Sequence, residues 1–188
     1  MNNITNIIEM IIADELDGVN AISIVDRPAI ESNFVYLSKD DVTLKEVDTE
    51  KRILMGAALI PDKHILRKGE EGDYYIYFSQ KTVRQASEKF LLLGNQGNAT
   101  IQHSKEISGV SLVESWIVED PSKDKSSIYL QDIPKGTWMV SMKIYDDEIW
   151  DNFVKTGKVK GFSIEGLFDR KVDMSDAELF EKVLGLLK

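Results

Sequence analysis

Short apolar stretches recur along the chain, and most of them have the period of two that is typical of β-strands. The clearest lies at residues 138–144, where Trp138, Val140 and Met142 share one face. The same pattern, or a continuous apolar run bounded by turn residues, predicts further strands at 21–25, 33–37, 53–60, 73–78, just before 103, at 110–118 and at 158–168. The opening segment 4–12 fits either a helix or a strand, and we favour a strand.

Three stretches instead have the signals of helices. Ser79 can cap a helix that carries an apolar stripe and stops at Gly94, and acidic residues at 146–148 begin a short helix that stops at Gly157. Ser175 and Glu178 form a capping box before a C-terminal amphipathic helix. Many strands with occasional helices predict a mostly β, α+β fold, arranged as an antiparallel barrel or sandwich decorated by helices.

The polar segment 38–52 has little periodicity, as is typical of a solvated connector. It suggests three parts: an N-terminal segment with the connector at 1–50, a core domain at 51–172 and the C-terminal amphipathic helix at 173–188.

Composition narrows the function classes. The 188 residues include no cysteine, which excludes disulfides, a thiol nucleophile and thiolate metal sites. A net charge of −9 with dispersed basic residues argues against direct nucleic-acid binding. No apolar run is long enough for a membrane span and no secretory signal is visible, so we expect a soluble, unexported protein without membrane contact. The sequence has no closely spaced histidines and carboxylates of the kind that bind a metal, and we expect no metal and no cofactor.

Candidate chemistry centres on Ser163, which lies between Gly161 and Gly166. A serine nucleophile needs a general base, and the chain has only two histidines, His64 and His103. His103 is the better candidate because His64 belongs to a loop sequence. The G-x-S-x-G pattern of α/β-hydrolases is not matched, and a structural serine in a strand bounded by glycines is the alternative.

Two glutamates compete as partner of the imidazole. Alternation places Glu114 on an otherwise apolar strand face, where a carboxylate should have a partner, and a hairpin between the strand before His103 and the strand 110–118 would bring the two together. Glu165 competes because it points to the same side of its strand as Ser163.

Several blocks together resemble the tailed-phage prohead serine proteases of the XkdF-like type, which are related to the herpesvirus assemblins. They are AISIVDRPAIE at 21–31, VESWIV at 113–118, KGTWMV at 135–140 and GFSIEG at 161–166. The resemblance implies an assemblin-like antiparallel barrel surrounded by helices, with Ser163 as nucleophile and His103 as general base. The third catalytic residue does not carry over by motif position. The place of Glu114 on an otherwise apolar strand face selects it for this role, with Glu165 in reserve.

The resemblance also implies a capsid-maturation endopeptidase in the host cytoplasm, packaged inside the procapsid. Its substrates would be extensions of the scaffold and major capsid proteins, and the segment 1–50 would be an autoinhibitory propeptide removed by self-cleavage. Two rival hypotheses remain: a non-enzymatic phage structural or scaffold-binding protein that retains the barrel, and an inactive domain whose terminal helix forms a homo-oligomer.

Self-processing gives a direct test. Purified wild-type protein should shorten during incubation, whereas Ser163→Ala should stay intact because it lacks the nucleophile. Intact-mass spectrometry over time measures both species. A wild-type mass that never changes would count against self-cleavage.

Overall fold

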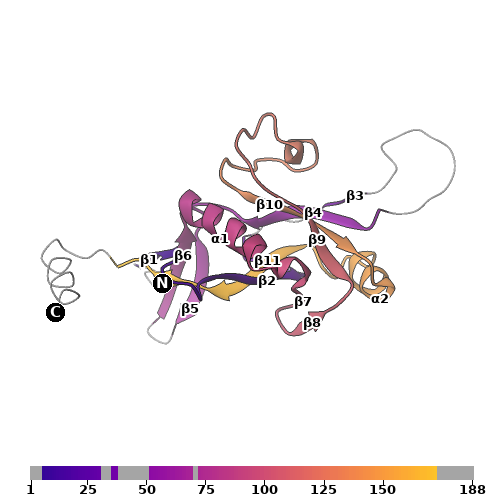
Figure 1. Cartoon of the computed structure of the whole chain (residues 1–188), viewed down its shortest axis with the longest axis horizontal. Coiled ribbons are helices and arrows are strands. Elements are labelled where there is room, and N and C mark those ends of the chain that lie inside the picture. Colours follow the sequence, from indigo (N-terminus) through magenta and orange to yellow (C-terminus); the bar gives the residue numbers. More distant parts are fainter. Residues whose placement is uncertain (1–5, 31–34, 38–50, 70–71, 173–188) are drawn as a thin grey trace, which may run out of the picture.

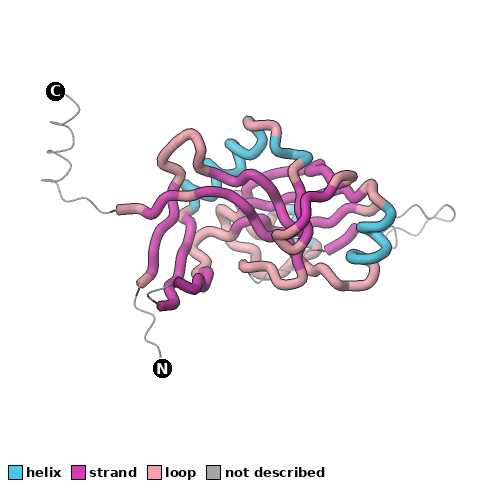
Figure 2. The backbone as a smooth tube through the Cα atoms, turned by 90° about the horizontal axis from the view of Figure 1, so that it is seen from below, coloured by secondary structure: helices cyan, strands magenta, loops and turns pink. Residues whose placement is uncertain are grey.

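The computed structural model describes residues 6–30, 35–37, 51–69 and 72–172. Strands are the commonest regular element of the described backbone (Figure 2). The strands are β1 (Ile7–Ile11), β2 (Gly18–Val25), β3 (Val35–Leu37), β4 (Ile53–Leu59), β5 (Ile65–Gly69), β6 (Gly72–Phe78), β7 (Ala99–Ile101), β8 (Lys105–Ile107), β9 (Val110–Ile117), β10 (Trp138–Ile144), β11 (Gly161–Leu167) and β12 (Asp169–Arg170). The helices are α1 (Gln80–Leu92) and the short α2 (Asp147–Ile149), which continues into a π-helical turn at Trp150–Val154. Short 3-10 turns lie at Asn95–Gly97 and Lys125–Ile128.

The strands form three four-stranded sheets, in the orders β12-β1-β6-β5, β3-β4-β10-β9 and β11-β2-β7-β8. Most pairs are antiparallel, but β1 runs parallel to β6 and β2 runs parallel to β7. Figure 1 shows the β5–β6 hairpin at one end of the molecule and α2 at the other. The α+β class is therefore confirmed, whereas the antiparallel barrel is wrong for the described residues, where the sheets are mixed and do not close. Periodicity identifies strands but not their partners, and the two parallel pairings join segments far apart in the sequence.

The core lies between the sheets and α1. Ser79 caps α1 by accepting a hydrogen bond from the Thr82 N–H at 3.4 Å, and the ring of Phe90 packs edge-on against Trp138 at 5.6 Å. The central strand β10 is buried along almost its whole length because β4 and β9 flank it. In the described part of the chain, no helix combines the length and the apolar character needed to cross a membrane.

Sequence periodicity identified most elements. The strands expected at 21–25, 53–60, 73–78, 110–118, 138–144 and 158–168 are confirmed with small shifts, as is the helix after Ser79. The opening segment is a strand, β1, as favoured. The sequence patterns missed β5 and β8. All but one residue of each strand is exposed, so neither strand has an alternation of apolar and polar residues.

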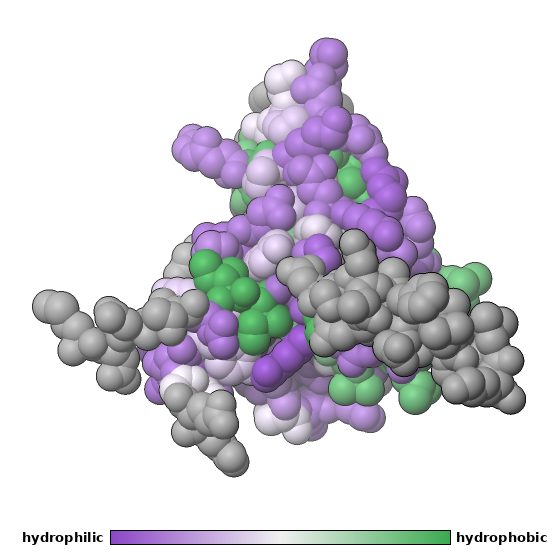
Figure 3. Space-filling view, turned by 90° about the vertical axis from the view of Figure 1, so that its left-hand side faces the viewer, coloured by the Kyte–Doolittle hydropathy of each residue, from purple (hydrophilic) through white to green (hydrophobic). Residues whose placement is uncertain are grey.

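The segment before residue 51 contributes to the folded core. β2 lies between β11 and β7, and its residues Val19, Ile22 and Ile24 are fully buried. Most of the expected connector, at 38–50, and the expected C-terminal helix at 173–188 lie outside the described residues. Seen from the end that carries the β5–β6 hairpin, the surface is mostly hydrophilic, with a few separate apolar groups (Figure 3).

A close approach of two strands explains why Gly166, the second glycine of the GFSIEG sequence at 161–166, is a glycine. At Gly166 the register between β11 and β2 shifts at a bulge, and a Cβ built there would lie 2.0 Å from the carbonyl oxygen of Gly18. Backbone atoms cannot move aside as a flexible side chain can. Glycine is therefore required here for the pairing of the strand that carries Ser163.

Gly166→Ala should lower the free energy of unfolding by about 2 kcal/mol or more, because the new methyl group overpacks the strand pair. Chemical denaturation measures the loss. Gly97→Ala is the matched control, since a Cβ at Gly97 meets nothing within 4 Å, and we expect a change within about 0.5 kcal/mol. Equal stability of the two variants would contradict the close-approach explanation.

Candidate functional site

Ser163 lies on β11 directly opposite Ser23 of β2. Residues opposite each other in an antiparallel pair project to the same face, so the two hydroxyl groups lie side by side. The neighbouring Phe162 projects to the other face and is fully buried in the core. Ser163 keeps 7% of its surface exposed and Ser23 keeps none, so Ser163 is the more accessible serine of the pair.

His103 belongs to the tight turn that joins β7 to β8. Gln102 and His103 both have positive φ, at 52° and 54°, and the Ser104 N–H donates to the Ile101 carbonyl at 3.1 Å. A non-glycine residue in this conformation is uncommon, and two in succession store strain that the surrounding structure must hold. The turn is strained where it presents the imidazole.

Backbone hydrogen bonds hold the turn against β2. The Gln102 N–H donates to the Ile24 carbonyl at 3.1 Å, and the His103 N–H donates to the Ser23 hydroxyl oxygen at 3.0 Å. The buried Ser23 hydroxyl therefore has a backbone donor as its partner, as buried polar groups require. Ser23 thus touches His103 directly and lies beside Ser163.

Glu165 is the carboxylate beside the imidazole. Its Oε1 lies 3.0 Å from Nδ1 of His103 and also accepts a hydrogen bond from the Thr100 hydroxyl. Both side chains remain partly exposed, at 44% for His103 and 32% for Glu165. An Nδ1–H that donates to Glu165 leaves Nε2 free to accept a proton.

The structure thus gathers three of the four candidate residues on one face of the sheet β11-β2-β7-β8. Ser163 and Glu165 come from β11, and His103 reaches the same face from the β7–β8 turn. Within the described part of the chain, no hydrogen bond joins the Ser163 hydroxyl to the imidazole. Such contacts often tighten only when a substrate is bound.

Glu114 lies elsewhere, and its expected pairing with His103 is wrong. β7 pairs with β8 and β9 pairs with β10, so the anticipated hairpin between the strand at His103 and β9 does not form. A register shift between Leu112 and Glu114 also breaks the alternation and leaves the Glu114 side chain 47% exposed. Hydrogen bonds from Lys125, at 2.6 Å, and from Ser141 lower the pKa of Glu114.

The second histidine is not brought to this site. His64 packs against Tyr75 and Tyr77 of β6, with ring centroids at 5.8 and 6.1 Å. His103 is therefore the imidazole on the face of Ser163.

Sequence reasoning missed Ser23 and Thr100, which support the histidine and the glutamate. A signal for Ser23 was present, because it is the one polar residue in the apolar run 21–25 and a buried hydroxyl needs a partner. The signal could not identify the partner, which comes from a turn about 80 residues later.

One acidic cluster within the described ranges has carboxylate oxygens close enough to hold a cation. It consists of Asp14, Asp17 and Asp169. Asp17 already accepts the N–H groups of Ala13 and Asp14, at 2.7 and 3.2 Å, which accounts for its burial as a turn-stabilising residue. We therefore do not assign a metal site to this cluster.

A serine and an imidazole with a carboxylate at Nδ1 are the side-chain set of serine hydrolases. The chain belongs to the family whose model is described as "Putative phage serine protease XkdF", which matches residues 41–172. Family membership supports a protease, and the family name indicates the serine type. No curated protein and no solved structure matches the chain significantly. The family match includes Ser163, His103 and Glu165 but not β2 with Ser23.

Ser23→Ala should free the His103 turn, because it removes the only acceptor of the His103 N–H that the described structure provides. We expect a loss of about 1–3 kcal/mol in unfolding free energy and faster hydrogen exchange at the His103 amide, measured by NMR. Ser111→Ala is the control, because among the described residues the Ser111 hydroxyl makes only a 3.5 Å contact to the Leu112 carbonyl. Unchanged exchange at His103 would show that Ser23 does not hold the turn.

Proposed function

We propose that this protein is a phage prohead maturation serine endopeptidase with Ser163 as nucleophile, His103 as general base and Glu165 as the acid that orients the imidazole. The observation that carries the proposal is the 3.0 Å contact between His103 Nδ1 and Glu165 Oε1, on the sheet face where Ser163 lies opposite Ser23. Family membership supports the reaction class.

The arrangement supports acyl transfer in two stages. Nε2 of His103 takes the proton of the Ser163 hydroxyl as Oγ attacks the peptide carbonyl carbon, and a tetrahedral intermediate forms. The imidazolium then gives this proton to the leaving amine, and the C–N bond breaks to leave an acyl-enzyme. Water then attacks the ester carbonyl carbon while Nε2 of His103 takes its proton. This proton passes to Oγ of Ser163 as the ester C–O bond breaks, and the new carboxylic acid leaves.

Glu165 takes the role that the sequence pattern assigned to Glu114. Its carboxylate fixes the tautomer with the proton on Nδ1 and stabilises the imidazolium that forms during attack. The Thr100 hydroxyl donates to the same oxygen and holds the carboxylate in place. Glu114 lies on another sheet, β3-β4-β10-β9, and forms an ion pair with Lys125 of the 3-10 turn.

The resemblance to phage prohead proteases motivates a proposal for the biological role. We propose that the enzyme acts inside the procapsid, in the host cytoplasm, and removes extensions from the scaffold and major capsid proteins. Self-cleavage within the connector 38–50 fits the fold better than removal of the whole N-terminal segment, because β2 supports both β11 and the His103 turn. The scaffold and major capsid proteins are the proposed partners.

Active-site labelling tests the assignment of nucleophile and base. A fluorophosphonate probe should attach to Ser163 in the wild type, fail to attach to Ser163→Ala, and react roughly 10²- to 10⁴-fold more slowly with His103→Ala, because the base is missing. Peptide mapping by mass spectrometry locates the label. Labelling at another serine would contradict Ser163 as the nucleophile, whereas no labelling of a folded wild type would favour a non-enzymatic phage structural protein.

The same probe separates the two glutamates. Glu165→Gln should slow labelling by about 10-fold or more, because an amide at Nδ1 cannot stabilise the imidazolium. Glu114→Gln, the matched control on another sheet, should label at the wild-type rate. The reverse order would reinstate Glu114 as the third residue.

A further inference from the structure

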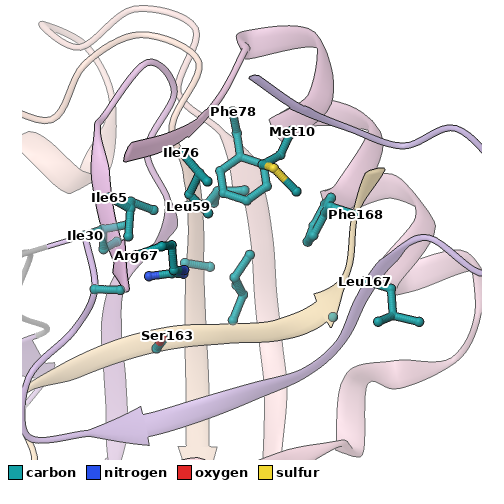
Figure 4. Close-up of a pocket in the computed structure, with 14 residues that line it drawn as sticks. Met10, Ile30, Leu59, Ile65, Arg67, Ile76, Phe78, Ser163, Leu167 and Phe168 are labelled. Carbon is teal, nitrogen blue, oxygen red and sulfur yellow. The ribbon is translucent and has the colours of Figure 1, made fainter. Parts of the chain in front are cut away.

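A cavity of about 260 Å³ lies beside Ser163. β11 forms one wall, and the other walls come from β1, β4, β5 and β6 and from the residues that follow β2. Figure 4 shows the lining side chains, with Ser163 on β11 at the edge of the cavity. The space adjoins the strand of the proposed nucleophile, so a peptide positioned for attack could place a side chain in it.

Apolar side chains dominate the lining. The large apolar residues of the lining include Ile30, Leu59, Ile65, Ile76, Phe78 and Ile164. The rings of Phe78 and Phe168 pack edge-to-face at 4.8 Å, which stiffens the wall. A branched or aromatic side chain would gain free energy by leaving water for this space.

Arg67 is the one charged residue that lines the cavity, within the described ranges. Its Nη1 donates to the carbonyl oxygen of the preceding Leu66 at 3.2 Å, and in the described part of the chain no carboxylate forms an ion pair with it. Arg67 is exposed as a whole residue, yet the apolar surroundings partly desolvate its guanidinium and lower its pKa. Figure 4 shows the Arg67 side chain between Ile65 and Ser163 in that view.

A guanidinium at the edge of an apolar cavity favours a carboxylate ligand, because its planar donors match the two carboxylate oxygens. The chain is acidic, with a net charge of −9, so a cation without a carboxylate partner among the described residues is unusual. An acidic group on the substrate would supply the partner that the described residues do not.

We infer that this cavity is the substrate side-chain pocket, which takes a large apolar side chain while Arg67 binds a nearby acidic residue of the same peptide. The inference rests on the proposed function, because it places the scissile bond beside Ser163. The chain's own segment 41–50, with the sequence DVTLKEVDTE, has this composition: Leu44 and Val47 stand close to Glu46 and Asp48. It is therefore the probe of choice.

Binding to Ser163→Ala protein tests the inference without any need for cleavage. The acetylated and amidated peptide of residues 41–50 should bind in isothermal titration calorimetry. A peptide in which Glu46 and Asp48 become Gln and Asn should bind about tenfold more weakly, because a charge-assisted hydrogen bond is lost. A peptide in which Leu44 and Val47 become serine should also bind about tenfold or more weakly.

Arg67→Gln, made in the same Ser163→Ala background, should bind the acidic and the amide peptides equally. Lys68→Gln is the matched control. It also removes one positive charge from β5, but Lys68 does not line the cavity. Thermal melting checks that both variants are folded. The control should keep the tenfold preference for the acidic peptide.

Three results would overturn the inference: no binding of the acidic peptide, no preference for acidic over amide side chains, or an equal loss of preference in Lys68→Gln and Arg67→Gln. These failures are distinct from failure of the proposed function. Fluorophosphonate labelling of Ser163 reports the nucleophile, whereas the titrations use protein that lacks it.

Discussion

The candidate site depends on the placement of β2 between β11 and β7. This strand pairs on one side with the strand that carries Ser163 and Glu165, and on the other with the strand that leads to His103. Its buried Ser23 hydroxyl then accepts the backbone N–H of His103. Without β2, no strand would pair with both β11 and β7 to hold Ser163 and His103 in fixed positions relative to each other.

Two local departures from ordinary backbone geometry surround this arrangement. Gly166 lets β11 approach the backbone of Gly18, and the β7–β8 turn holds Gln102 and His103 at positive φ. The two positive φ angles of the turn cost free energy, and they persist because hydrogen bonds and strand pairing around the turn compensate. The rigidity of the sheet thus fixes the position of an imidazole that is itself partly exposed.

The charges near the site follow a simple division. Glu165 is held by the polar groups of Thr100 and His103, whereas Glu114, on a different sheet, forms an ion pair with Lys125. Arg67 lines the apolar cavity beside Ser163 without a carboxylate partner in the described residues. An oriented carboxylate at the histidine and a desolvated cation at the cavity are separate features, which is why the proposed chemistry and the proposed specificity can be tested separately.

The sequence by itself determined the local elements: the buried strands β4 and β10, the capped helix α1, and the placement of Ser163 and His103 on or beside strands. These depend on periodicity and capping, which act over a few residues. Only the tertiary structure decided that Glu165 rather than Glu114 meets His103, and that the sheets stay open. Strand partners are chosen by contacts between distant segments, and one bulge between Leu112 and Glu114 is enough to change the face of a side chain.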